Sequence, residues 1–395
     1  MMKHCFPCIL SLFIVALFFS SCSIKEKPVP EILPEPIQKP VLSGLDVLEM
    51  SDFAILKNLN VGLIANHTSV NRSGIHSVEL LSVRDDLLLK RIFAPEHGFR
   101  GKLDAGEFFD SKKDIETEIE IISLYGMSKR PDPKYIQDLD VLVFDIQDIG
   151  SRYYTYVSAM TYMMESAAEN KIPIIILDRP NPINGVDVQG PVLQIEHASF
   201  VGLHPIPIRH GMTMGEIARM INGQGWLKND LRCELSIIPI KNWRRSEYIS
   251  EFNYPWLPPS PNIPDDSTAL IYNGFCLLEG TNISEGRGTD RPFKIFGAPW
   301  IEGKELSEDL NKLKLKGVKF SPVDFTPVSL PGKSKWPKYQ DQACSGCYVQ
   351  ITEFQSFHPL EIAVSVLSQI QESYLQNFQF LDTGFIHKLY GSTQL

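Results

Sequence analysis

The chain has 395 residues, of which 43% are hydrophobic and 22% are charged, and its formal net charge at pH 7 is −9. This length and composition are typical of a soluble globular protein with two domains and exclude a mainly disordered chain. A negative net charge without a run of lysine and arginine argues against a nucleic-acid-binding protein, so we expect small-molecule partners.

The N-terminal region has the pattern of an exported protein. Residues 1–21 carry Lys3 and an apolar run from Phe6 to Phe19, which has the length of a signal peptide and is short for a membrane span. The next residue, Cys22, ends a Phe-Ser-Ser-Cys sequence that resembles a bacterial lipoprotein cleavage box, so we expect Cys22 to carry lipid. An ordinary signal peptide is the alternative. Residues 22–43 contain five prolines and are predicted to form an extended tether.

The remaining chain is predicted to form a larger domain over residues 44–255 and a smaller α/β domain over residues 256–395. In the first, short apolar runs alternate with helical stretches, which predicts a Rossmann-like, mostly parallel sheet with helices on both faces. The predicted strands are residues 61–65, 91–94, 141–144, 172–177 and 235–240, and the predicted helices are residues 157–170 and 211–222. The proline-rich residues 256–264 are expected to connect the two domains.

Polar residues directly follow four of these strands. They are Asn66 and His67, Glu96 and His97, Asp145 with Asp148, and Asp178 with Arg179. Ligands of open α/β sheets bind beyond the carboxyl ends of the strands, where side chains from separate strands converge. We therefore expect a site at this edge.

Nucleotide and metal cofactors have little support in the sequence. No Gly-x-Gly-x-x-Gly motif follows the first strand and no Walker phosphate loop is present, so we predict no cofactor. His67, His97 and Asp145 are plausible metal ligands, but no His-x-x-x-His type spacing supports a metal site, and we predict none.

A second group of charges lies on a glycine-rich loop in residues 278–293. An apolar run at residues 271–278 is predicted to be a buried strand, and Glu279, Glu285, Arg287 and Arg291 follow it. Converging groups of this kind suit a pocket for a polar, anionic ligand. The alternative is a salt-bridged surface loop.

The rest of the C-terminal region carries a predicted strand at residues 348–352 and a predicted amphipathic helix at residues 359–374. We expect the site between the two domains. Cys344 and Cys347 have the spacing of redox and zinc motifs but lack two further ligands nearby, so we interpret them as a structural pair or as free thiols.

From about Gly44 to its end, the sequence resembles the exo-acting β-N-acetylmuramidases of the NamZ type. The shared motifs are Pro-Glu-His-Gly-Phe-Arg-Gly at residues 95–101, residues 144–156, Leu-Asp-Arg-Pro-Asn-Pro at residues 177–182, residues 210–213, residues 259–262 and the Glu279 loop. The resemblance implies a Rossmann-like domain, a smaller α/β domain, a cleft between them, and release of N-acetylmuramic acid from the non-reducing end of peptidoglycan fragments. Family members usually have a small aliphatic residue at Cys347-Tyr348 and a segment beyond Leu395.

A glycosidase needs a carboxylic acid that protonates the leaving oxygen and a second group that acts as base or nucleophile. We predict Glu96 as the acid, with Asp145 as the runner-up and Glu285 as a possible base. An acetamido sugar could also supply its own nucleophile, so inversion and retention both stay open. The predicted substrate-binding residues are His97, Asp148, Arg152, Asp178, Arg179, Asn181, Glu279, Asn282 and Arg287.

Each role has a structural alternative. Glu96 could only hold its turn, Asp145 could cap a helix, and Asp178 could pair with Arg179 alone. Among the arginines, Arg287 ahead of Arg152 is predicted to bind the lactyl carboxylate of muramic acid.

Two other functions compete with the muramidase. One is a metal-dependent envelope hydrolase, such as a sugar deacetylase, which would use His67, His97 and Asp145 and would lose activity on chelation. The other is a non-catalytic, peptidoglycan-binding lipoprotein, which would show no turnover.

We predict that lipid is attached at Cys22, because the apolar signal ends directly before it and a tether follows. Labelled palmitate should enter the wild-type protein in a bacterial host. Equal labelling of Cys22→Ala would contradict lipidation at this cysteine.

Overall fold

The computed structural model describes residues 39–95, 111–124 and 129–395, and residues 39–395 form one compact unit. Its larger sheet has the order β3-β4-β2-β1-β5-β6-β7, and every neighbouring pair is parallel except β3 with β4. These strands are β1 (Asn60–Ala65), β2 (Leu88–Ala94), β3 (Ser111–Lys113), β4 (Glu120–Ser123), β5 (Val141–Asp145), β6 (Ile174–Leu177) and β7 (Leu235–Ile238). The prediction of a mostly parallel α/β sheet is confirmed.

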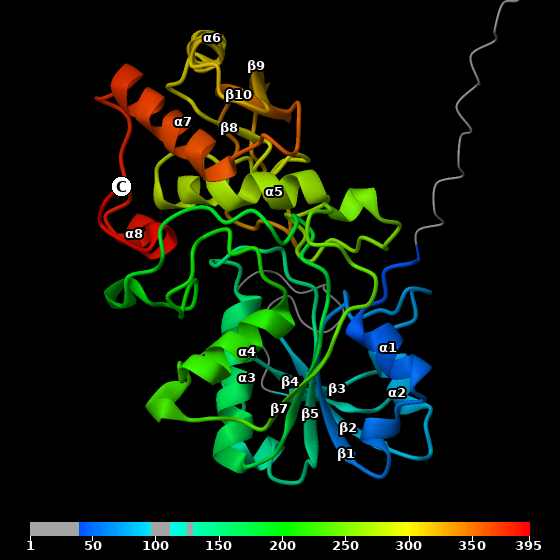
Figure 1. The fold of residues 1–395 in the computed structure, drawn as a ribbon. Coiled ribbons are helices and arrows are strands. Elements are labelled where there is room, and N and C mark those ends of the chain that lie inside the picture. The colour runs from blue at the N-terminus through cyan, green and yellow to red at the C-terminus, as the bar shows by residue number, and fades with distance from the viewer. Residues whose placement is uncertain (1–38, 96–110, 125–128) are drawn as a thin grey trace, which may run out of the picture. The chain divides into compact units, whose positions relative to one another are not determined.

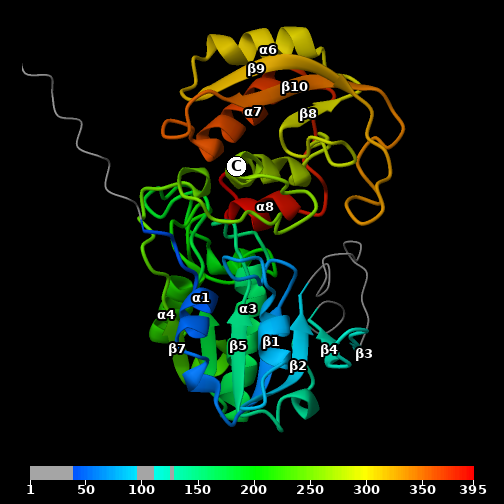
Figure 2. The same cartoon turned by 90° about the vertical axis from the view of Figure 1, so that its right-hand side faces the viewer.

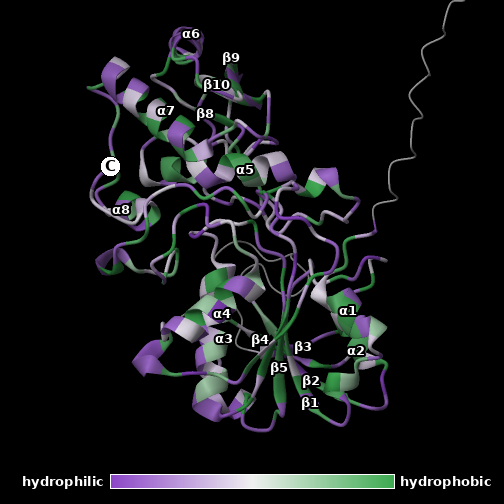
Figure 3. Cartoon of the chain, viewed as in Figure 1, coloured by the Kyte–Doolittle hydropathy of each residue, from purple (hydrophilic) through white to green (hydrophobic). Residues whose placement is uncertain are grey.

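Helices cover both faces of this sheet, as Figure 1 and Figure 2 show. On one side lie α1 (Gly44–Met50) and α2 (Ser77–Ser82), and on the other lie α3 (Tyr156–Asn170) and α4 (Met214–Gln224). The central strands are therefore buried on both faces and consist mainly of apolar residues, so that their arrows are mostly green in Figure 3. In β5, Leu142 and Phe144 join one core, whereas Val141 and Val143 join the core of the opposite face.

The local sequence explains where α4 begins and ends. Thr213 and Glu216 form a capping box, in which each side chain accepts a hydrogen bond from the backbone N–H of the other residue. Gly225 ends the helix in the left-handed conformation with φ 73°. The predicted helix at residues 211–222 is thus confirmed with shifted bounds.

The second sheet is small and antiparallel, with the order β8-β10-β9. The elements of this part are α5 (Asp266–Phe275), β8 (Ile295–Ala298), α6 (Gly303–Lys312), β9 (Val318–Phe325), β10 (Cys344–Ile351), α7 (Pro359–Ser373) and α8 (Phe385–Tyr390). Helix α6 packs on β9 and β10, while α7 packs on α5. The division at residues 255/256 stays a prediction, and one apolar core extends from the α3 face of the large sheet into this part.

The predicted strand at residues 271–278 is wrong. These residues lie in α5 and in the following 3-10 helix Cys276–Gly280. Every residue of α5 from Thr268 onward is buried, so the segment has no exposed face whose periodicity would separate a buried helix from a buried strand. The helix signal lies just upstream, where the Asp265 carboxylate accepts hydrogen bonds from the Thr268 N–H and hydroxyl group.

Cys344 and Cys347 lie on β10 and are free, buried thiols. Cys233 and Cys276, which lie elsewhere in the described chain, are also free and buried. Within the described ranges, no helix combines the length and apolar character that a membrane crossing requires.

Candidate active site

The carboxyl ends of β1, β5 and β6 bring polar side chains together, as the sequence predicts. Asp145 is the last residue of β5 and pairs with Ala65 at the end of β1. The Arg179 guanidinium, which follows β6, contacts the Asp145 carboxylate through Nε and Nη2, both at 2.7 Å from Oδ1. Burial raises the pKa of Asp145, and Arg179 opposes that rise. Both side chains are inaccessible to solvent, so this pair holds the edge of the sheet together.

Asp178 also has a structural partner, but it is not the Arg179 side chain. Its carboxylate accepts hydrogen bonds from the Thr213 hydroxyl (2.8 Å) and the Gly215 N–H (2.8 Å) at the start of α4. Burial raises its pKa to about 6. The structural alternatives were a helix cap for Asp145 and pairing with Arg179 for Asp178. The structure shows the reverse, because Asp145 pairs with Arg179 and Asp178 caps a helix.

Asp148 is a buried carboxyl group without a cationic partner in the described part of the chain. Its Oδ2 accepts a hydrogen bond of 2.7 Å from the Gly150 N–H, and Oδ1 is buried without a partner there. Burial raises the pKa of Asp148 to about 7. The His210 Nε2 atom lies 3.9 Å from Asp148 Oδ2, and burial lowers the pKa of His210 to about 3, so this imidazole brings no positive charge at neutral pH. Asp148 can therefore hold a proton near neutral pH.

The second charge cluster lies on the loop after the 3-10 helix. The Arg287 guanidinium donates to Glu279 Oε1 from Nη2 (2.7 Å) and Nε (3.1 Å), and its Nε lies 3.6 Å from Glu285. Lys338 donates to Glu285 at 3.0 Å and also to the carbonyl oxygens of Leu278 and Ile283. Two carboxylates and two cations thus form one cluster without net charge. Of the four predicted charges, Glu279, Glu285 and Arg287 lie in this cluster, whereas Arg291 is half exposed and lies 3.8 Å from Asp290. The charges of the cluster are paired with one another, as the alternative of a salt-bridged loop predicts.

A row of aromatic rings links the two groups of polar residues. Tyr156 and Tyr154 pack edge to face with their ring centroids 4.9 Å apart, and the ring centroids of Tyr154 and Tyr272 are 6.0 Å apart. Tyr272 in turn contacts Phe293 at 4.8 Å, and the Arg287 guanidinium lies 5.1 Å above Phe293. The row begins near the end of β1, because the Asn66 amide donates to the Tyr156 hydroxyl group. Sheet edge and charged loop therefore belong to one connected region.

Three predicted substrate-binding residues hold backbone segments instead. Arg152 is 1% exposed, and its guanidinium donates to four carbonyl oxygens, including those of Leu389 and Tyr390. Asn181 donates to the Met212 carbonyl, and Asn282 donates to the Asn377 carbonyl. We assign structural roles to all three.

Glu96 and His97 lie outside the described residues, as does Cys22. The strand before Glu96 is described, however. β2 ends at Ala94 and is paired with β1 in the same direction as β5, so its carboxyl end lies at the edge that carries Asp145. His67, the third proposed metal ligand with His97 and Asp145, contacts the Pro258 carbonyl oxygen through Nε2 at 2.7 Å. The described residues contain no group of three or more His, Cys, Asp or Glu side chains that could hold a metal ion.

Lys338 and the aromatic row were not predicted from the sequence. Lys338 lies more than 50 positions from its partners, in a segment without a periodic pattern, and no sequence signal marks it. The Tyr153-Tyr154-Thr155-Tyr156 run was a signal, because buried tyrosines carry both an apolar ring and a polar group that needs a partner.

The chain is similar to known proteins both in sequence and in structure. A family model described as exo-beta-N-acetylmuramidase NamZ, N-terminal, matches residues 61–267. A second model, described as exo-beta-N-acetylmuramidase NamZ, C-terminal, matches residues 270–395. The peptidoglycan beta-N-acetylmuramidase NamZ of Bacillus subtilis is 41% identical over 364 residues, which cover 92% of this chain and 85% of the relative. Two crystal structures of DUF1343 family proteins from Bacteroides fragilis are also similar. The first has a TM-score of 0.81 and 34% sequence identity, and the match covers 89% of each chain. The second has a TM-score of 0.71 and 32% identity, and the match covers 90% of this chain and 89% of the other.

We predict that Asp148 makes the stability of the fold depend on pH. Its pKa rises from 3.8 to about 7 on folding, so the folded state holds this proton more tightly. The resulting stabilisation is complete below about pH 4 and is lost as the pH rises through about 7. Asp148→Asn removes this titration and should gain stability relative to the wild type over that range, by roughly a few kcal/mol, since one pKa unit corresponds to about 1.4 kcal/mol.

Urea unfolding at a series of pH values measures this difference, in which the contributions of titrating groups far from Asp148 cancel. The exposed Asp382→Asn is the matched control and should follow the wild type. A constant difference between Asp148→Asn and the wild type from pH 4 to pH 7 would contradict the prediction.

Proposed function

Because the chain belongs to the exo-β-N-acetylmuramidase NamZ family, we propose that it releases N-acetylmuramic acid from the non-reducing end of peptidoglycan fragments. It is a glycoside hydrolase, and its substrates derive from peptidoglycan. The observation that carries this function is the match of both family models, which together span the large sheet, the charged loop and the aromatic row between them.

We propose Glu96 as the general acid. It follows Ala94, the last residue of β2, by two positions, and β2 ends at the edge where β5 presents Asp145. The structure changes the order of the alternatives. Asp145 is held by Arg179, whereas Asp148 has a pKa of about 7, which lies near the operating pH as a general acid requires. Asp148 therefore replaces Asp145 as the second candidate for the acid.

The charged loop is suited to the anionic part of a muramic acid residue. The described residues leave Arg287 Nη1 without a hydrogen-bond acceptor, and the guanidinium side chain is 28% exposed. Since Glu279 and Glu285 are balanced by Arg287 and Lys338, the cluster as a whole does not repel a carboxylate. We propose that the lactyl carboxylate binds Arg287 and that Glu285, fixed by Lys338, serves as the second catalytic carboxylate.

Export is a further part of this proposal. We propose that the signal peptide directs export and is removed before Cys22, and that a lipid on Cys22 and the proline-rich residues 22–43 then hold the enzyme at the membrane surface of the cell envelope. Peptidoglycan lies in that compartment. The net charge of −9 supports a function without nucleic acid.

The function and the acid are tested together on the disaccharide of N-acetylmuramic acid and N-acetylglucosamine. The wild-type protein should release both monosaccharides, and it should still do so in the presence of a chelator. Glu96→Gln keeps hydrogen-bonding capacity but cannot donate a proton of similar acidity, so turnover should fall by about a hundredfold or more. The loss should shrink with a nitrophenyl muramide, whose leaving group needs little protonation.

Glu79→Gln on the exposed face of α2 controls for the substitution itself. Acetate release in place of sugars would instead indicate a deacetylase, and binding without products would indicate a non-catalytic protein. Near-normal turnover by a folded Glu96→Gln protein would move the assignment to Asp148.

Arg287→Ala should lower the preference for muramides over glucosaminides by about ten- to a hundredfold, because it removes a charge-assisted contact to the lactyl group. The measurement is kcat/KM for nitrophenyl muramide and nitrophenyl glucosaminide. Arg291→Ala, on the same loop and half exposed, is the matched control and should keep the wild-type preference. An unchanged preference in Arg287→Ala would exclude this arginine as the carboxylate-binding group.

A further inference from the structure

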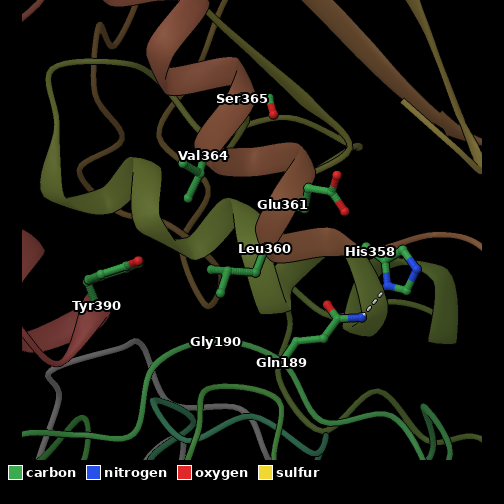
Figure 4. A pocket seen from close by; sticks show the side chains of 8 residues that line it. All are labelled: Gln189, Gly190, His358, Leu360, Glu361, Val364, Ser365 and Tyr390. Atoms are coloured by element: carbon green, nitrogen blue, oxygen red, sulfur yellow. Dashed lines mark hydrogen bonds between the residues drawn. The ribbon is translucent and has the colours of Figure 1, made fainter. Parts of the chain in front are cut away.

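A pocket of about 430 Å³ lies between a loop of the large-sheet part and helices α7 and α8, as Figure 4 shows. The loop contributes Gln189 and Gly190, and α8 contributes Tyr390. The remaining lining residues are His358, the N-cap residue of α7, and Leu360, Glu361, Val364 and Ser365 in its first turns. Gly190 has φ 90°, and a Cβ atom there would lie 2.7 Å from Leu360 Cδ2. The loop therefore approaches α7 this closely because glycine is present.

One side of the pocket is apolar and the other is polar. Leu360, Val364 and Tyr390 point toward one another in Figure 4 and form the apolar side. Gln189, His358 and Glu361 lie on the opposite side. A volume of this size with apolar walls and a few convergent polar groups is typical of small-molecule sites.

The polar groups are available to a ligand. Gln189 donates from Nε2 to His358 Nδ1 at 2.7 Å, while its Oε1 is buried without a hydrogen-bond partner among the described residues. A buried acceptor without a partner costs free energy that a ligand O–H or N–H recovers. With Nδ1 as acceptor, the neutral His358 ring carries its proton on Nε2 and can donate it. The same described part of the chain gives the Glu361 carboxylate, the Ser365 hydroxyl and the Tyr390 hydroxyl no hydrogen-bond partner.

This arrangement defines the ligand chemistry. Glu361 is the charged group of the pocket and disfavours anions, so the lactyl carboxylate of muramic acid does not suit it. Side chains line the pocket, and they offer no strand edge on which a peptide could add by backbone pairing. A neutral sugar has hydroxyl groups for Gln189 and Glu361, and its C–H face and acetamido methyl group suit Tyr390, Leu360 and Val364.

We propose that this pocket is a second carbohydrate site that binds a neutral N-acetylated amino sugar, such as an N-acetylglucosamine unit of peptidoglycan. The choice of sugar rests on the proposed function, whereas the pocket itself does not. Such a site would bind a glycan separately from the residues that cleave its terminal bond.

The test uses N,N′-diacetylchitobiose, a neutral disaccharide without a lactyl group, and measures binding by calorimetry and by saturation-transfer NMR on the acetamido methyl groups. The wild-type chain should bind it. Ser365→Trp fills the pocket and should abolish binding, whereas Ser368→Trp, three positions further along α7 and exposed, should leave it unchanged. Gln189→Leu should weaken binding by about tenfold, since it removes the buried acceptor.

Hydrolysis of the muramyl disaccharide is measured on the same preparations and should be equal in the wild type, Ser365→Trp and Ser368→Trp. Chitobiose binding that survives Ser365→Trp, or no chitobiose binding by an active wild-type enzyme, would overturn the second site and leave the enzymatic function intact. Binding of an isolated stem peptide in place of chitobiose would overturn the sugar assignment. Loss of hydrolysis in all proteins with normal chitobiose binding would count against the proposed function alone.

Discussion

The Arg179 guanidinium at the edge of the large sheet holds three separate segments in one place. It contacts Asp145 at the end of β5, the Val70 carbonyl oxygen after β1, and the Tyr254 hydroxyl near the start of the second part of the chain. A buried ion pair of this kind recovers its desolvation cost only if its geometry is good and its remaining donors are bound. Here Nε, Nη1 and Nη2 each have an acceptor, so the ends of the strands have little freedom to move. The candidate site depends on this fixed edge.

Burial and ion pairing divide the carboxyl groups of the site into two kinds. Asp148 is buried and has no cationic partner among the described residues, and burial raises its pKa to about 7. Glu279 and Glu285 lie beside Arg287 and Lys338, so each is held as a hydrogen-bond acceptor. Acid and base roles in a glycosidase require carboxyl groups in such different surroundings. The aromatic row fixes the two surroundings relative to each other, because Tyr154, Tyr272 and Phe293 pack into one continuous core.

Much of the large sheet could be predicted because its strands are short apolar runs that are followed directly by polar residues. The edge where Asp145 and Arg179 meet followed from the parallel arrangement alone. The segment at residues 271–278 could not be assigned correctly, since a helix buried on all sides leaves the same pattern as a buried strand. Arg152 was equally ambiguous: its type suggests a carboxylate ligand, and only the folded chain reveals that carbonyl oxygens surround it. The two motif-bearing residues Glu96 and His97 lie outside the described residues, and their roles rest on sequence.

The Arg152 side chain makes the order of synthesis matter for folding. Two of its donors are bound by the carbonyl oxygens of Leu389 and Tyr390, and Gly391 lies so close that a Cβ atom there would be 2.7 Å from Nη2. A nascent chain that ends before these residues would bury a guanidinium with two unbound donors, which costs more free energy than leaving it in water. Because chains emerge from the ribosome N-terminus first, the loop that carries Arg152 reaches its final state only when α8 arrives. Prematurely terminated chains would therefore lack the last helix and would also have an unfinished first domain. That unfinished domain would be exposed to proteolysis.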